Sequence, residues 1–259
     1  MENELTNFKP EEVAKKIINF IKKEVQEAGF KRVIIPLSGG IDSSTTAFLA
    51  VKALGPDNVL VVELPYKDLN HDRDAELVIA QLKIPLANVY EIEISEIVES
   101  FVKKLPKPDR LRTANIMARI RMILLYDLAK KHQALVCGTE NKSEYLLGYF
   151  TRFGDEASDL EPIRNLYKTE VLKLAKYLGV PEKIIEKAPT AGLWKGQTDE
   201  GELGFSYEQA DPILYLHFDK KYSCEEIVKK GYKKELVEKV KTQVEANRFK
   251  HEVPKTLPV

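Results

Sequence analysis

The segment Ser38-Gly39-Gly40-Ile41-Asp42-Ser43 has the clearest chemical potential in this chain. It follows a run of branched apolar residues, 32–37, and precedes a helix-forming stretch, 45–54. Two adjacent glycines let backbone N–H groups turn inward as an anion-binding nest, and the start of the following helix adds partial positive charge. The two serine hydroxyls can donate further hydrogen bonds. The pattern predicts a phosphate-binding loop; the simpler alternative is a glycine turn in which the aspartate caps the helix.

Two carboxylates are candidate metal ligands beside this loop. Asp42 lies inside it, and Glu144 follows a second glycine-containing turn, 138–139, which also comes after an apolar run. A nucleoside triphosphate carries several negative charges, and Mg²⁺ offsets them through one or two carboxylates together with phosphate and water oxygens. We therefore expect Asp42 and Glu144 to hold Mg²⁺. Taken alone, Glu144 is better explained as a glutamate on the surface of a helix, and the motif that surrounds it supports the metal role.

Strand-forming and helix-forming segments alternate around these turns. The predicted strands cover 32–37, 58–64, 89–94 and 134–137, and the predicted helices cover about 13–25, 45–54, 71–83, 97–102 and 113–131. This order predicts an α/β fold, a doubly wound parallel sheet with helices on both faces. Ligands bind beyond the carboxyl ends of the strands in such sheets, which is where the two turns must lie.

The rest of the chain has a different pattern. Helices are expected at about 168–178, 208–216, 224–230 and 233–247. The intervening segments 149–162 and 189–206 are long loops and candidate lids over a site. We expect a single domain spanning 1–259, with a mainly helical part from about 205.

Composition excludes several classes of protein. The 40 Lys and Arg residues balance 40 Asp and Glu residues, and the apolar fraction is 44%, which argues against disorder and against nucleic-acid binding driven by overall basicity. No apolar run is long enough to span a bilayer, so we expect no membrane partner. The start of the chain does not resemble a signal peptide, and the two cysteines, Cys137 and Cys224, have no zinc-type spacing. These features predict a cytoplasmic protein.

The charge is unevenly distributed along the chain. Residues 220–259 hold 11 Lys or Arg and 6 Asp or Glu, a net charge of +5, which leaves −5 for residues 1–219. Two interpretations remain open: a solvated helical tail, or a basic edge next to an anionic ligand.

The loop sequence resembles the PP-loop, SGGxDS, of the N-type ATP pyrophosphatases. It lacks the Gly-Lys-Ser/Thr ending of the Walker A loop. The resemblance implies an adenine nucleotide alpha hydrolase-like, Rossmann-like fold. It also implies cleavage of ATP between its α and β phosphates, with transfer of AMP to a substrate.

Further motifs narrow the resemblance to the ammonia-dependent NAD synthetases. They occur in the family's order at 115–122, 138–144, 148–155, 159, 162–163, 166–168, 189–193 and 199–200. The resemblance implies that ATP adenylates the carboxylate of deamido-NAD (nicotinic acid adenine dinucleotide), and that ammonia then displaces AMP to give NAD. Only 31 residues precede the first predicted strand, too few for the glutaminase domain of glutamine-using members, so we expect ammonia to be the direct donor.

The resemblance also implies roles for individual residues. The implied ATP contacts are Pro36, Leu37, Ser38, Gly39, Gly40, Ile41, Asp42, Ser43, Thr139, Lys168 and Thr190. The implied deamido-NAD contacts are Arg119, Arg152, Asp159, Phe249 and Lys250. Mg²⁺ is implied at Asp42 and Glu144. Lys168 would stabilise charge developing on the transferring phosphate, and Asp155 would serve as a base or orienter for ammonia.

Several of these assignments are open on the residues alone. Arg119 and Arg121 are about 200° apart on one helix, so we assign Arg119 to the ligand and expect Arg121 on the surface or in an ion pair. The alternative for Thr139 is a cap for a helix near 140–146. Lys168 begins a helix, where its charge is unfavourable for the helix dipole, and this favours a functional role.

Two departures from the family pattern concern the dinucleotide contacts. Arg152 stands where the family usually has lysine, and Arg keeps the positive charge. Phe249-Lys250 stands where the family commonly has His-Lys, with His251 one position later, so the register of this contact is open.

We expect a homodimer, because the family binds deamido-NAD across a dimer interface. The apolar positions of the helix at 113–131 exceed one stripe, which indicates either an interface helix or a helix fully buried within the domain. Two rival functions remain. A tRNA-thiolating PP-loop enzyme would need a broad basic surface and a cysteine pair. A non-catalytic nucleotide-binding regulator would not need the paired carboxylates.

Overall fold

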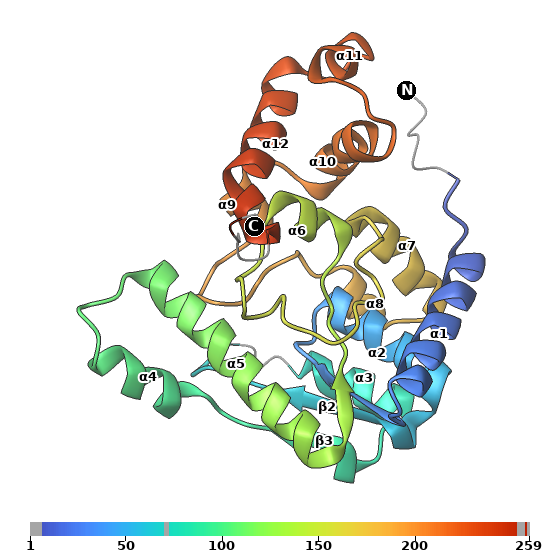
Figure 1. Cartoon of the computed structure of the whole chain (residues 1–259), viewed down its shortest axis with the longest axis vertical. Helices are drawn as coiled ribbons and strands as arrows, with labels where there is room; N and C mark the ends of the chain where they lie inside the picture. The colour runs from blue at the N-terminus through green and yellow to red at the C-terminus, as the bar shows by residue number, and fades with distance from the viewer. Residues whose placement is uncertain (1–6, 70–72, 253–256, 258–259) are drawn as a thin grey trace.

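A four-stranded parallel sheet forms the centre of the chain in the computed structural model, which describes residues 7–69, 73–252 and 257 (Figure 1). The strands are β1 (Arg32–Pro36), β2 (Val59–Glu63), β3 (Val89–Glu91) and β4 (Ala134–Val136). Their order across the sheet is β3-β2-β1-β4, and all three pairings are parallel. The predicted α/β fold with a parallel sheet is therefore confirmed.

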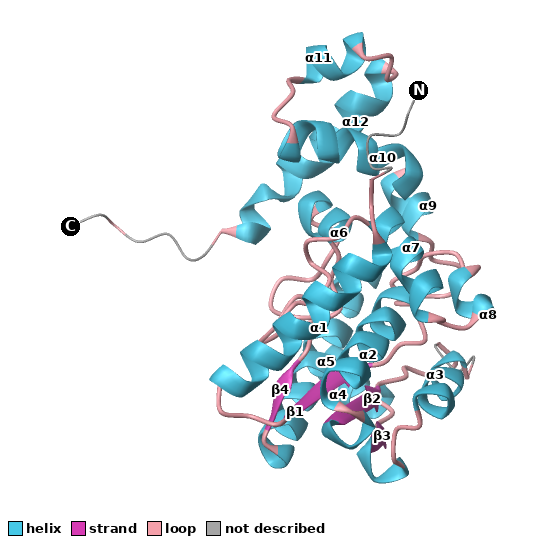
Figure 2. Cartoon of the chain, turned by 90° about the vertical axis from the view of Figure 1, so that its right-hand side faces the viewer, coloured by secondary structure: helices cyan, strands magenta, loops and turns pink. Residues whose placement is uncertain are grey.

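Helices cover both faces of this sheet (Figure 2). The side chains of β1 alternate between faces: Val33 and Ile35 join one hydrophobic cluster, and Ile34 joins another. The first cluster contains residues of α1 (Pro10–Glu27), α2 (Ile41–Leu54), α3 (Asp74–Leu82), α7 (Lys168–Leu178) and α8 (Glu182–Ile185). The second contains residues of α4 (Ser95–Lys103) and α5 (Arg110–His132). Burial of each such aliphatic side chain contributes roughly 1.5–3 kcal/mol, so the two clusters hold the sheet rigid.

The element boundaries differ from the sequence predictions where capping decides them. The helix expected at 45–54 begins at Ile41, because Gly40 takes the extended conformation of an N-cap residue. The helix expected near 140–146 is α6 (Lys142–Leu147), which Asn141 caps. The predicted helix at 71–83 is α3, which begins at Asp74; residues 71 and 72 lie outside the described residues. Sequence reasoning missed α8 and the short α9 (Asp199–Leu203), both of one turn or little more.

Helices alone follow in the described residues after 205. They are α10 (Tyr207–Leu214), a π-helical turn (Tyr215–Asp219), α11 (Cys224–Lys229), α12 (Lys234–Asn247) and a 3₁₀ turn (Arg248–His251). All of these except the 3₁₀ turn contribute to a third hydrophobic cluster, together with Leu147 of α6 and Tyr167. Figures 1 and 2 place these helices beyond the end of the sheet, over α6 and α7. None of the described helices is long and apolar enough to cross a membrane.

Asp211 connects this helical part to the rest of the chain. Its carboxylate is fully buried and accepts hydrogen bonds from the Ser143 hydroxyl at 2.6 Å and from the Thr169 N–H at 2.9 Å. Burial raises the pKa of Asp211 to about 6, although both hydrogen bonds favour its charged form. One side chain therefore joins α10 to the first turns of α6 and α7.

We predict that Asp211→Ala lowers the free energy of unfolding by about 2–3 kcal/mol, because two buried donors lose their acceptor. Chemical denaturation measures this change. Glu208→Ala, an exposed position on the same helix, is the matched control and should change stability by less than about 0.5 kcal/mol. Equal effects of the two substitutions would contradict the role given to Asp211.

Candidate functional site: a nucleotide-binding cleft

A cavity of about 1080 Å³ lies at the carboxyl ends of β1, β2 and β4. From β1 the chain proceeds to β2 and β3 on one side of the sheet, and it then returns to β4 on the other side. The loops after β1 and β4 diverge at this reversal, which leaves space between them. Both turns that the sequence singled out line the cavity, together with parts of the loops 149–162 and 189–206.

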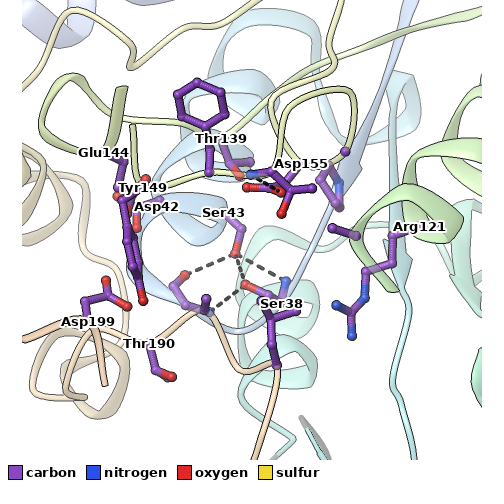
Figure 3. Close-up of a pocket in the computed structure, with 18 of the residues that line it drawn as sticks. Ser38, Asp42, Ser43, Arg121, Thr139, Glu144, Tyr149, Asp155, Thr190 and Asp199 are labelled. Atoms are coloured by element: carbon purple, nitrogen blue, oxygen red, sulfur yellow. Dashed lines mark hydrogen bonds between the residues drawn. The ribbon is translucent and has the colours of Figure 1, made fainter. Parts of the chain in front are cut away.

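Hydrogen bonds within the loop after β1, predicted above to be an anion nest, hold it in a tight turn (Figure 3). The N–H groups of Ser38 and Gly40 donate to the serine hydroxyls of the loop, each at 3.3 Å, and the Ser43 hydroxyl donates to the Gly40 carbonyl at 3.2 Å. Gly39 has φ of +72°, a left-handed conformation that favours glycine. The N-terminus of the 14-residue helix α2 points into the same space.

A buried ammonium group lies between two carboxylates beside the nest. Lys168 Nζ is 2.5 Å from Asp42 Oδ2 and 3.1 Å from Glu144 Oε1. Burial opposes the charge on Lys168, but the two carboxylates outweigh it and raise the pKa of Lys168 above its ordinary value. Burial and the negative charge of Asp42 raise the pKa of Glu144 to about 8, against the attraction of Lys168. A cation bound here would favour the ionised form of Glu144, in which the three groups carry a net charge of −1.

The starts of three helices position these groups. Asp42 lies in the first turn of α2, Glu144 in that of α6, and Lys168 is the first residue of α7. Asn141 caps α6 and also donates to Asp42 Oδ1 at 3.0 Å. The Ser143 hydroxyl accepts from the Lys168 N–H at 2.9 Å. The unfavourable position of Lys168 at a helix start thus has a structural explanation, because its partners are carboxylates of neighbouring helices.

Asp199 is a cavity carboxylate that sequence reasoning did not single out as a site residue. It is buried in the first turn of α9, accepts from the Tyr207 hydroxyl at 3.0 Å, and interacts electrostatically with Lys168. The only signal for Asp199 in the sequence was that residues 199–200 match the family pattern, and that match assigned no role to either residue. Within the described part of the chain, no three His, Cys, Asp or Glu side chains are grouped to hold a metal ion. Two carboxylates beside an anion nest nevertheless fit Mg²⁺, which takes its remaining ligands from phosphate and water.

Most of the sequence-predicted site residues line this one cavity. They are Pro36, Leu37, Ser38, Gly40, Ile41, Asp42, Ser43, Arg119, Thr139, Glu144, Arg152, Asp155, Lys168, Thr190, Phe249 and Lys250.

Two predicted site residues do not line the cavity. Gly39 packs against α3, where a Cβ atom would lie 2.9 Å from Asp74 Cβ. Asp159 is drawn to the edge of the sheet, since its carboxylate accepts from the Val136 N–H at 2.7 Å and its own N–H donates to the Val136 carbonyl.

The structure changes the interpretation of the arginine pair on α5. Arg119 is exposed and donates to the Arg152 carbonyl at 3.2–3.3 Å. Arg121 was expected on the surface or in an ion pair, and this was wrong. It forms part of the cavity wall, and its Nε donates to the Leu64 carbonyl at 3.0 Å. Because α5 runs alongside the cavity, two positions about 200° apart both border it.

The cap of α6 and the register of the C-terminal segment were both ambiguous on sequence grounds. Asn141 rather than Thr139 caps α6, so Thr139 is not the helix cap and borders the cavity. In the C-terminal segment, Lys250 Nζ donates to the Gly148 and Phe150 carbonyls at 2.6 and 2.9 Å, and Lys250 borders the cavity. His251 instead packs edge-on against Tyr145.

We predict that Gly39→Ala weakens ATP binding at least tenfold, because its Cβ would collide with α3 and displace the nest. Gly29→Ala is the matched control. Gly29 has φ of +79°, but open space surrounds its Cβ position, so that substitution adds backbone strain alone. Calorimetric titration with ATP measures the effect, and equal affinities for the two variants would count against the nest.

Comparison with known proteins agrees with this geometry. The sequence profile of the family described as NAD synthase matches residues 13–254. The NH(3)-dependent NAD(+) synthetase of Thermococcus kodakarensis is 50% identical over 241 residues, which cover 92% of this chain and 93% of that protein.

Solved structures agree as well. The NH3-dependent NAD synthetase of Campylobacter jejuni, in complex with the nitrate ion, has a TM-score of 0.82 and 33% identity over 96% of this chain and 100% of that chain. The structure of NMN synthetase from Francisella tularensis has a TM-score of 0.85 and 33% identity over 98% of this chain and 100% of that chain. The family resemblance expected from the motifs is confirmed: this chain belongs to the NAD synthase family.

Proposed function

We propose that this chain catalyses the ATP-dependent amidation of deamido-NAD with ammonia, giving NAD, AMP and pyrophosphate. The observation that carries the proposal is the Lys168 ammonium group between Asp42 and Glu144, directly beside an anion nest. A carboxylate is a poor electrophile, so amide formation needs a leaving group on its carbonyl carbon. A site that binds ATP and exposes the α-phosphate to a carboxylate can supply AMP as that leaving group.

The nest and its neighbours support the binding of ATP. The phosphates would lie against the loop 38–43 and at the start of α2, with Thr139 and Thr190 on the adjoining walls. Asp42 and Glu144 would hold Mg²⁺, which supplies neutralisation of the charge on the departing pyrophosphate. Lys168 would contribute a fixed positive charge at the same place, and its raised pKa keeps it protonated.

Two displacements account for the products. In the first, a carboxylate oxygen of deamido-NAD attacks the α-phosphorus of ATP, the bond from that phosphorus to the bridging oxygen breaks, and pyrophosphate leaves. In the second, ammonia attacks the carbonyl carbon, the bond from that carbon to the phosphate oxygen breaks, and AMP leaves. The nitrogen gives up one proton.

Asp155 is the group we propose for handling ammonia. It lies in the cavity wall, where the Thr151 N–H donates to its carboxylate at 3.0 Å. Its side chain is open to the cavity, and partial desolvation by the surrounding protein raises the pKa of Asp155, against its backbone hydrogen bonds. A carboxylate of this kind can hold an ammonium ion, orient the ammonia nitrogen and accept a proton.

Arg119, Arg152, Phe249 and Lys250 are our proposed contacts for the dinucleotide. They border one side of the cavity, so part of the basic tail contributes to its wall. Arg152 donates to the Glu252 carbonyl, which joins the tail to the loop 149–162. Trp194 borders the cavity with its ring 4.3 Å from the Arg110 guanidinium carbon, which supports a lid role for the loop 189–206. A closed lid would exclude the water that hydrolyses an acyl-adenylate.

We further propose that the chain acts as a homodimer with α5 at the interface. Leu111 and Ile123 on this helix are 62% and 56% exposed, whereas Met117 and Leu125 are buried within the chain. Asp159 lies outside the cavity of its own chain, so a role in binding deamido-NAD would require a site shared between two copies. Sedimentation equilibrium should give twice the chain mass at micromolar concentration; a monomer would contradict the dimer.

The central prediction is stoichiometric. Purified protein given ATP, Mg²⁺, deamido-NAD and an ammonium salt should produce NAD and AMP in equal amounts, measured by chromatography. Appearance of ADP instead of AMP would contradict the mechanism.

Nicotinic acid mononucleotide is the rival substrate to include, because one structural neighbour is an NMN synthetase. A higher kcat/KM for the mononucleotide would contradict the dinucleotide assignment.

Variants connect this assay to the carboxylates. Asp42→Asn should lower turnover at least 100-fold with the fold intact, since it removes both an ion-pair partner of Lys168 and a metal ligand. Asp57→Asn, in the turn before β2, should leave turnover unchanged. An active Asp42→Asn enzyme would remove Asp42 from the mechanism.

Glu144→Ala should raise the Mg²⁺ concentration needed for half-maximal rate.

A further inference from the structure

Arg121 is a half-buried cation to which the proposed reaction gives no role. It extends from α5 into the wall of the cavity, and its Nε donates to Leu64 at the carboxyl end of β2. Its Nη2 is buried and has no hydrogen-bond partner among the described residues. A guanidinium group has five N–H donors in a rigid fork, and one carbonyl uses only one of them.

The surroundings of Arg121 offer little compensation for its charge. The Nη2 atom is enclosed although the side chain as a whole is half-buried, and burial lowers the pKa of Arg121 to about 10, so the group stays charged at neutral pH. The charged group that acts on it is Asp155, which opposes this decrease. A buried and unpaired charge is costly, and such groups are retained where an oppositely charged partner arrives.

The position of Arg121 identifies which partner is missing. Figure 3 shows Asp42, Glu144 and Asp199 on one side of the nest and Arg121 on the opposite side, with Asp155 between them in the view. The acidic side suits the metal-bound pyrophosphate of ATP. The diphosphate of the dinucleotide has Arg119, Arg152 and Lys250 as its proposed partners. The anion still without a partner is the carboxylate that becomes the amide, and it must lie close to the group that handles ammonia.

We propose that Arg121 binds the reacting carboxylate of the substrate through charge-assisted hydrogen bonds. The inference rests on the proposed function and adds a residue that recognises the acid. Two anions, the carboxylate and the α-phosphate of ATP, must approach each other before adenylation. A fixed cation next to the carboxylate, at the carboxyl end of β2, lowers the repulsion between them. The amide product is neutral and loses the charge-assisted bonds. Arg121 therefore distinguishes the substrate from the product.

Equilibrium binding tests this directly and requires no turnover. Calorimetric titrations of the full-length chain use deamido-NAD, NAD and ATP as separate probes, without ammonium. The unmodified protein should bind deamido-NAD more tightly than NAD by a factor on the order of 10 to 100. Arg121→Met should abolish that preference and leave the affinities for NAD and ATP within about threefold. Arg121→Lys should retain part of the preference, because it keeps the charge without the fork.

Arg112→Met is the matched control, since Arg112 is an exposed arginine of α5 that donates to the Pro106 carbonyl away from the cavity. It should keep the full preference for deamido-NAD. The preference is the decisive readout, because a merely structural role for Arg121 would weaken the binding of both dinucleotides equally.

Three outcomes would overturn the assignment. Retention of the preference in Arg121→Met shows that another group recognises the carboxylate. Loss of ATP affinity with the preference intact assigns Arg121 to a phosphate. Equal loss of all three affinities, with a lower melting temperature, assigns it to the support of β2. If the unmodified protein still makes NAD, any of these outcomes rejects only the role of Arg121 and leaves the proposed function in place. If the unmodified protein binds neither dinucleotide, both the role of Arg121 and the proposed function are refuted.

Discussion

The ion pairs of Lys168 with Asp42 and Glu144 are the interaction on which the cleft depends. Each group sits at the start of a different helix, so the contact sets the positions of α2, α6 and α7 relative to one another. Removing Lys168 would leave two carboxylates facing each other in a site with little solvent, whereas removing one carboxylate would leave a single ion pair. Asn141 and Ser143 support the arrangement through hydrogen bonds to Asp42 and to the backbone of Lys168. The same contacts that hold the helices together thus concentrate charge beside the nest.

The sheet explains why these helix starts meet. Parallel strands need crossover helices, and every helix that follows a strand begins at the carboxyl edge of the sheet. The reversal between β1 and β4 separates two neighbouring loops at that edge. The hydrophobic clusters on both faces fix the strands, and the C-terminal helices cover α6 and α7 through their own cluster. A rigid frame therefore surrounds a cavity whose walls are polar loops.

Charge is balanced over the chain but not within the cleft. The sum of 40 positive and 40 negative groups gives no net attraction for polyanionic substrates. Around the cavity, the acidic side holds Asp42, Glu144 and Asp199, while Arg119, Arg121 and Lys250 border other parts of its wall. Such local separation lets a neutral protein bind a metal-bound pyrophosphate and a dinucleotide in adjoining places, because short-range contacts in a cleft are screened less than exposed charges.

The sequence by itself determined the alternation of strands and helices, the nest at 38–43 and the unusual lysine at the start of α7. These features are local: apolar periodicity, adjacent glycines and a charge at a helix end each act over a few neighbouring residues. The destinations of single side chains depended on packing between distant segments. Helical periodicity placed Arg121 away from Arg119, yet α5 borders the cavity with both positions. The Asp159 carboxylate accepts a hydrogen bond from the backbone of β4, and Asn141, not the alternative Thr139, caps α6. Only the tertiary structure decided these, because the competing partners come from elements far apart in the chain.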